Sequence, residues 1–181
     1  MCSVRSTEIA QNFKEQGNEY FKEKRYREAL GFYTQGVDAQ PTDVVLQEAL
    51  LCNRAACHLE LGEIFFFHFG HFHSKWTPFG RTGNYGSVIR DCARALANNS
   101  HCSKALYRSA LALVALDRLE EAVEHCDQCL SFDSQNQSVK KLRDRANQAL
   151  AAKRRKEQER IQTLQQEKQA KQLLNSALRV S

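Results

Sequence analysis

Five side chains in three separate stretches of the sequence are suited to contact with a negatively charged ligand. Lys14 and Asn18 lie four residues apart, as do Lys104 and Arg108, and Asn53 stands between the two pairs. Residues at this spacing share one face of a helix. The set supplies three cations and two amides with no acidic residue among them, and such groups donate hydrogen bonds to anions.

A repeat in the sequence provides the scaffold that would hold these residues. The first unit covers 10–43 and has small, aromatic and proline residues at characteristic offsets, namely Ala10, Gly17, Tyr20, Ala29, Tyr33, Gly36 and Pro41. A matching unit covers 103–136, with Ala110 and Ala122 at equivalent offsets. These offsets resemble those of tetratricopeptide repeats, which implies that each unit is two antiparallel helices that bury their apolar faces only by stacking on neighbouring units. Residues 1–9 form a lead.

The middle unit, 48–102, is longer than the other two. Its predicted helices contain CNRAACHLELG and NYGSVIRDCARALANNS. The unit has the 34-residue length of the others only if Asn84 follows Gly62 directly, so residues 63–83 are 21 surplus residues in the turn between its helices. This insert holds six of the ten phenylalanines, three of the six histidines and the only tryptophan.

Three interpretations of the insert stay open. The first is an aromatic loop that docks on a membrane surface or on a partner. The second is a metal site at His68, His71 and His73, and the third is a translated intron. We favour the intron, because its removal restores the repeat and its ends can be encoded by codons that resemble splice junctions. A metal site is disfavoured, since no defined fourth ligand accompanies the histidines. Sequencing the transcript distinguishes these interpretations.

Composition narrows the class of protein. The 181 residues are 42% hydrophobic and 26% charged, which suggests one domain with an extension. No run of about 18 apolar residues predicts a membrane span. The seven cysteines, without an opening apolar signal segment, predict reduced thiols in a cytoplasmic or nuclear protein. No nucleophile–base pair or phosphate-binding loop is present, so we expect neither an enzyme nor a cofactor or metal.

Two remaining features are the cysteine pair CDQC and the basic C-terminal end. Cys126 and Cys129 fall at core offsets of the third unit and are predicted to pack as small hydrophobes. Residues 137–181 are predicted to cap the solenoid and then protrude as a basic helix, with helically spaced apolar residues at Val139, Leu142, Ala146, Ala149 and Leu150. The cluster 153–156 suits RNA or a ribosome, although a solvated helix face explains it better.

The repeat offsets, together with the five polar residues, resemble the tetratricopeptide repeat (TPR) domains that carry a two-carboxylate clamp. All five clamp positions are filled here, by Lys14, Asn18, Asn53, Lys104 and Arg108. The stretches QGNEYFKEKRYREAL, LLCNRAACHLELG and NYGSVIRDC resemble the tetratricopeptide repeat protein 4 group of co-chaperones, which has a fungal form. The resemblance implies an all-α fold, a solenoid of three repeats and six antiparallel helices with a long basic C-terminal helix.

The resemblance also implies a ligand. Clamp domains hold the C-termini of heat-shock proteins 70 and 90, which end in Glu-Glu-Val-Asp. Lys14 and Lys104 would each neutralise one carboxylate of the last residue, and Asn18 and Asn53 would donate to the main-chain carboxylate. Arg108 would reach a neighbouring glutamate or a backbone carbonyl. Members of this group continue into a separate C-terminal domain, so we expect this chain to lack one. The alternative function is a ribosome- or RNA-associated scaffold that acts through the basic helix.

Overall fold

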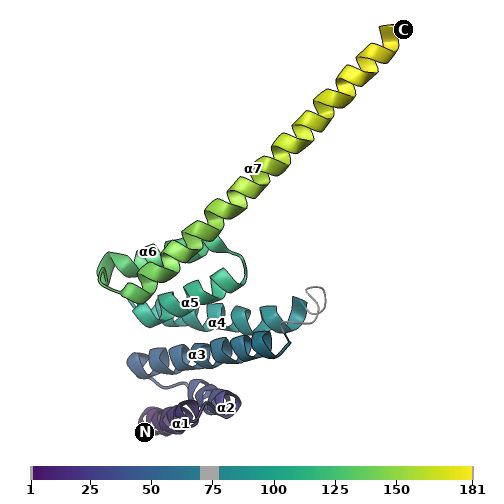
Figure 1. Cartoon of the computed structure of the whole chain (residues 1–181). Helices are drawn as coiled ribbons and strands as arrows, with labels where there is room; N and C mark the ends of the chain where they lie inside the picture. The colour runs from purple at the N-terminus through teal and green to yellow at the C-terminus, as the bar shows by residue number, and fades with distance from the viewer. Residues whose placement is uncertain (1, 70–77, 181) are drawn as a thin grey trace.

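The computed structural model describes the backbone of residues 2–69 and 78–180, and the side chains of 5–62 and 84–172. These residues form seven α-helices, which are α1 (Cys2–Lys22), α2 (Tyr26–Asp38), α3 (Val44–Phe69), α4 (Pro78–Asn98), α5 (Ser103–Ala115), α6 (Leu119–Phe132) and α7 (Gln137–Val180). The first six form three hairpins that stack in chain order, and α7 packs on α6 (Figure 1). The predicted three-repeat helical solenoid with a long C-terminal helix is confirmed.

Small residues allow the helices to approach closely. A Cβ atom built at Gly36 would lie 2.6 Å from Cδ2 of Leu50, so this glycine lets α2 pack directly on α3. Ala10, Ala29 and Ala55 have no exposed surface. The buried apolar side chains form two clusters, one that runs from α1 to α5 and one where α5, α6 and α7 meet, because each hairpin buries its apolar faces against the next. Of the repeat-offset residues in the first unit, Tyr20 is half-buried and the others are buried.

The turns of the first and third hairpins share a local design. Lys24 and Asp117 both adopt a φ of 60°, a left-handed conformation that is uncommon outside glycine. The next residue in each turn is an arginine, which directly precedes the second helix of the hairpin. This arginine forms an ion pair with a glutamate three residues later. The pairs are Arg25 with Glu28 and Arg118 with Glu121. The pairs are exposed, so they contribute little to stability, but they show that the two units are built alike.

The middle hairpin differs from the expectation that 63–83 form a turn. Residues 63–69 continue α3 and residues 78–83 belong to α4. Once a helix exists, each added residue gains a hydrogen bond at low cost, and 63–69 contain no glycine or proline to stop it. Pro78 begins α4, where its fixed φ and missing N–H are tolerated. The side chains of 63–83, including His68, His71 and His73, lie outside the described residues, as does the backbone of 70–77.

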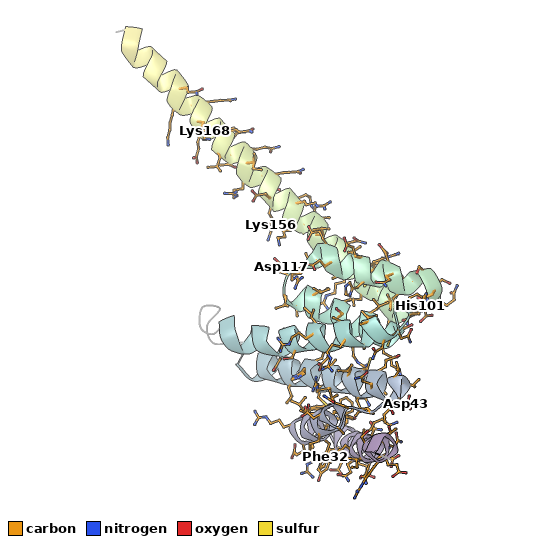
Figure 2. The ribbon with its side chains drawn as sticks, turned by 180° about the vertical axis from the view of Figure 1, so that it is seen from behind. Phe32, Asp43, His101, Asp117, Lys156 and Lys168 are labelled. Carbon is orange, nitrogen blue, oxygen red and sulfur yellow. The ribbon has the colours of Figure 1, made fainter. Side chains whose placement is uncertain are left out.

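Helix α7 closes the stack with its first turns and then leaves it. Val139, Leu142 and Ala146 are buried, whereas Ala149, which was also predicted to pack, is exposed because the helix has begun to diverge from α6. Lys153 Nζ donates to Asp117 Oδ2 at 2.6 Å and ties α7 to the α5–α6 turn. Beyond it the described side chains are exposed, and Figure 2 shows Lys156 and Lys168 on the protruding part. None of the described helices is long and apolar enough to cross a membrane.

Candidate functional site

The five predicted residues lie on the first helices of the three hairpins. Lys14 and Asn18 are on α1, Asn53 is on α3, and Lys104 and Arg108 are on α5. Each of these three helices packs on the second helix of its own hairpin. In addition, α1 contacts α3, and α3 contacts α5. Because the units stack in one direction, these helices line the same side of the solenoid. We call the surface formed by the five residues the groove.

One hydrogen bond joins the two amides of the groove, and a second joins Asn18 to Tyr33. Asn18 Oδ1 accepts from the Tyr33 hydroxyl at 2.8 Å and from Asn53 Nδ2 at 3.1 Å. Burial raises the pKa of Tyr33 to about 12, so the hydroxyl stays a neutral donor at physiological pH. The structure therefore brings Asn18 and Asn53 together and holds them with Tyr33. The sequence indicated Tyr33 only as a residue at one of the repeat offsets.

Gly17 makes room for this arrangement. A Cβ atom at Gly17 would lie 2.6 Å from Cε1 of the Tyr33 ring, which is closer than side chains tolerate. We expect Gly17→Ala to lower the free energy of unfolding by about 1–2 kcal/mol, because the overlap outweighs the better helix propensity of alanine. Urea denaturation measures this change.

Gly31 supplies the matched control. It is exposed on α2 and a Cβ atom there meets nothing within 4 Å. Gly31→Ala should therefore raise the free energy of unfolding by up to about 1 kcal/mol through helix propensity alone. Equal effects at the two glycines would contradict a steric role for Gly17.

Arg108 is the groove cation with the most unusual surroundings. The residue is half-buried, and its Nη1 atom is fully buried without a hydrogen-bond partner among the described residues. The positive charge of Arg108 acts on groups of three helices. It lowers the pKa of Tyr33, Cys57 and Cys92, whereas burial raises the pKa of all three. An unsatisfied charged donor of this kind destabilises the free protein.

The two lysines stand at the rim. Lys14 is half-buried and Lys104 is exposed. Among the ion pairs of the described residues, none uses Lys14, Lys104 or Arg108. Among the described residues, no hydrogen bond joins either lysine to the Asn18–Asn53 pair. The lysines therefore contribute positive charge to the groove without being neutralised by the ion pairs of the described chain.

A neighbouring cation is neutralised instead. Arg54 donates from Nε to Asp91 Oδ2 at 2.8 Å and from Nη2 to Oδ1 at 2.6 Å. The side chains are 14% and 6% exposed, so the pair is largely withdrawn from water. It ties α3 to α4 at the residue after Asn53. The pair fixes the part of α3 that presents Asn53, and sequence reasoning missed it because its members lie 37 positions apart.

An open pocket of about 470 Å³ adjoins the groove between α1 and the start of α3. Thr7 and Gln11 line it from α1, and Leu46 lines it from α3. Its charged lining residues are acidic, namely Glu8, Glu15 and Asp43. This end of the surface therefore repels anions, in contrast to the α5 end. No group of three or more potential metal ligands is arranged as a metal site within the described residues.

Comparison with known proteins places these observations in a family. A tetratricopeptide repeat model matches residues 103–136. The tetratricopeptide repeat protein 4 homolog of Dictyostelium discoideum is 32% identical over 173 residues, covering 94% of this chain and 38% of that protein. The Hsp70/Hsp90 co-chaperone CNS1 of Saccharomyces cerevisiae is 34% identical over 165 residues, covering 89% of this chain and 37% of that protein. The chain thus spans less than two fifths of these curated relatives.

Solved structures agree with the sequence matches. The first TPR domain of Spaghetti (RPAP3), bound to the HSP90 peptide SRMEEVD, has a TM-score of 0.63 and 30% identity, covering 80% of this chain and 95% of that one. The Hsp90 co-chaperone Cns1 from Saccharomyces cerevisiae has a TM-score of 0.68 and 35% identity, covering 87% of this chain and 45% of that one. The chain therefore belongs to the tetratricopeptide repeat family and is similar to its Cns1 and tetratricopeptide repeat protein 4 co-chaperones.

Proposed function

We propose that this protein is a co-chaperone adaptor whose groove binds the C-terminal Glu-Glu-Val-Asp tails of heat-shock proteins 90 and 70. One observation carries the proposal: Nη1 of Arg108 is buried without a hydrogen-bond partner among the described residues, and the helix that carries it lies on the same side of the solenoid as the joined amides Asn18 and Asn53. The similarity to co-chaperones and to a TPR domain bound to an HSP90 peptide supports it.

Each groove residue has a role in this proposal. A terminal aspartate carries a main-chain and a side-chain carboxylate, and Lys14 and Lys104 each neutralise one of them through charge-assisted hydrogen bonds. Asn18 and Asn53 donate from their amides to the main-chain carboxylate. Arg108 donates to a preceding glutamate or to a peptide carbonyl. An internal aspartate lacks the second carboxylate, so the groove selects chain ends.

The acidic pocket orients the bound tail. Glu8, Glu15 and Asp43 would repel the two glutamates that precede the terminal valine and aspartate. Those glutamates are therefore directed toward α5, where Arg108 and Lys104 lie. The groove is proposed to act without catalysis or cofactor, in the cytoplasm. The proposed units are 10–43, 48–102 with the insert 63–83, and 103–136, followed by the capping and protruding helix at 137–181.

Calorimetric titration of the full chain with tail peptides tests the proposal. The peptides SRMEEVD and SGPTIEEVD represent the two chaperones, and each is used with a free and with an amidated C-terminus. Amidation removes the main-chain carboxylate, so it should weaken binding at least about tenfold through the loss of a charged hydrogen-bond acceptor. Equal affinity for free and amidated peptides would rule out a carboxylate clamp.

A further inference from the structure

Two buried thiols face each other behind the groove. Cys52 on α3 and Cys102, the residue before α5, have their Sγ atoms 3.7 Å apart. They are 3% and 5% exposed and neither is in a disulfide. Cys52 immediately precedes Asn53, and Cys102 lies two residues before Lys104. The thiol pair therefore links the backbones that present two groove residues on neighbouring repeats.

The turn before α5 holds Cys102 against α3. Asn98 Nδ2 donates to Gln47 Oε1 at 2.9 Å, and Asn99 Nδ2 donates to Glu48 Oε2 at 3.0 Å. The Cys102 amide in turn donates to the Asn99 carbonyl at 3.1 Å. These bonds keep the two sulfurs facing each other. A disulfide has an S–S length of about 2.05 Å, so a shift of less than about 2 Å would join them.

The chemistry of Cys52 differs from that of the other buried thiols. The hydrogen bond with Cys102 lowers the pKa of the Cys52 thiol, and the positive charge of Arg108 acts in the same direction, while burial opposes both. Burial raises the pKa of Cys57 and of Cys92 to about 12. Because the thiolate is the reactive form, Cys52 is favoured for oxidation over those two neighbours.

We propose that Cys52 and Cys102 form a modification site, at which a hydroperoxide converts the thiol pair into a disulfide between α3 and α5. The Cys52 thiolate attacks a peroxide oxygen, the O–O bond breaks, and Cys52 becomes a sulfenic acid as the first water forms. The Cys102 sulfur then attacks the Cys52 sulfur, the S–O bond breaks, and a second water leaves. Two thiols are oxidised by two electrons and one hydrogen peroxide is reduced to two waters.

The disulfide is expected to weaken tail binding, an effect that rests on the proposed function. Drawing the sulfurs together moves the start of α5, and with it Lys104, relative to Asn53 on α3. Hydrogen bonds to a carboxylate lose strength within a few tenths of an ångström and with modest changes in angle. A groove that fits the reduced spacing therefore holds the terminal aspartate less well after oxidation.

Treatment of the full chain with hydrogen peroxide tests the modification directly. We expect the mass to fall by two hydrogen atoms, peptide mapping to find Cys52 joined to Cys102, and dithiothreitol to reverse both. Cys102→Ala should not form this link. Cys126→Ala is the matched control, because it removes a buried thiol on α6 and leaves the pair intact. Two results of peptide mapping would overturn the proposal: overoxidation of Cys52 without a link to Cys102, or disulfides formed chiefly between other cysteines. Peptide mapping of the wild-type protein is sufficient to distinguish these results.

Tail affinity gives the second readout. Oxidation should lower the affinity for SRMEEVD at least about fivefold in the wild type and in Cys126→Ala, and should leave Cys102→Ala unchanged. If reduced protein fails to bind the peptide, the proposed function fails while the mapped disulfide still stands. If reduced protein binds and the linked protein binds equally well, the disulfide has no effect on the groove and that part of the proposal is wrong.

Discussion

Asp91→Ala is expected to lower the free energy of unfolding by about 3–5 kcal/mol, the usual effect of removing one partner of a buried ion pair. Asp91 accepts two hydrogen bonds from Arg54, whose side chain is only 14% exposed. Without the carboxylate, the guanidinium is left charged and poorly solvated between α3 and α4. Urea denaturation followed by far-ultraviolet circular dichroism measures the change.

Two comparisons isolate the cause of this effect. Arg118→Ala breaks an equally close pair with Glu121, but both side chains are about half exposed, so the loss should stay below about 1 kcal/mol. The double variant Arg54→Leu/Asp91→Leu removes both charges together and should recover much of the stability lost in Asp91→Ala. If the double variant is no more stable than Asp91→Ala, an uncompensated charge is not the reason for the loss.

The second large effect concerns the groove. Lys14→Ala and Lys104→Ala should each weaken tail-peptide binding by more than about 1.5 kcal/mol, because each removes a hydrogen bond to a charged group. The double variant should lose about 3 kcal/mol, or more than about a hundredfold in affinity, since the lysines stand on separate helices and are proposed to contact different carboxylates. Calorimetry with SRMEEVD measures the three affinities.

A control is needed to show that the loss of affinity does not come from the reduced net charge of the protein alone. Arg27→Ala/Lys141→Ala also removes two cations, but both side chains are exposed on helices that do not line the groove. Its affinity should change by less than about threefold at physiological salt, where exposed distant charges are screened. Unchanged affinity in both single lysine variants would remove the basis for the clamp.

The sequence predicted the fold well because the repeat marks the close contacts between helices with small residues at fixed spacing. Gly17, Gly36 and Ala29 stand where helices meet closely, and their spacing is legible without any long-range information. The same spacing placed the five polar residues on the first helices of the hairpins. Their use as a clamp remains a prediction.

Other features depend on positions that a repeat pattern does not encode. Two such features join different helices, namely the hydrogen bond from Tyr33 to Asn18 and the ion pair of Arg54 with Asp91. They depend on the rotamers that the side chains adopt in the packed structure. The extension of α3 through residues 63–69 was missed because the repeat length, and not local helix propensity, was used to place the turn. Ala149 was predicted to pack because it continues the apolar spacing of α7. It is exposed because α7 has already diverged from α6 at this residue.

The length of α7 has a mechanical consequence. From residue 153 to its last described residue, Val180, the helix continues for 28 residues, which corresponds to a rod of about 40 Å at a rise of 1.5 Å per residue. The described side chains of this rod are exposed, and Figure 1 shows the helix projecting away from the stacked hairpins. A molecule held at its far tip would stand clear of a chaperone seated on the repeats. If a chaperone binds the repeats, a second partner held on the protruding helix would be separated from it by up to this length.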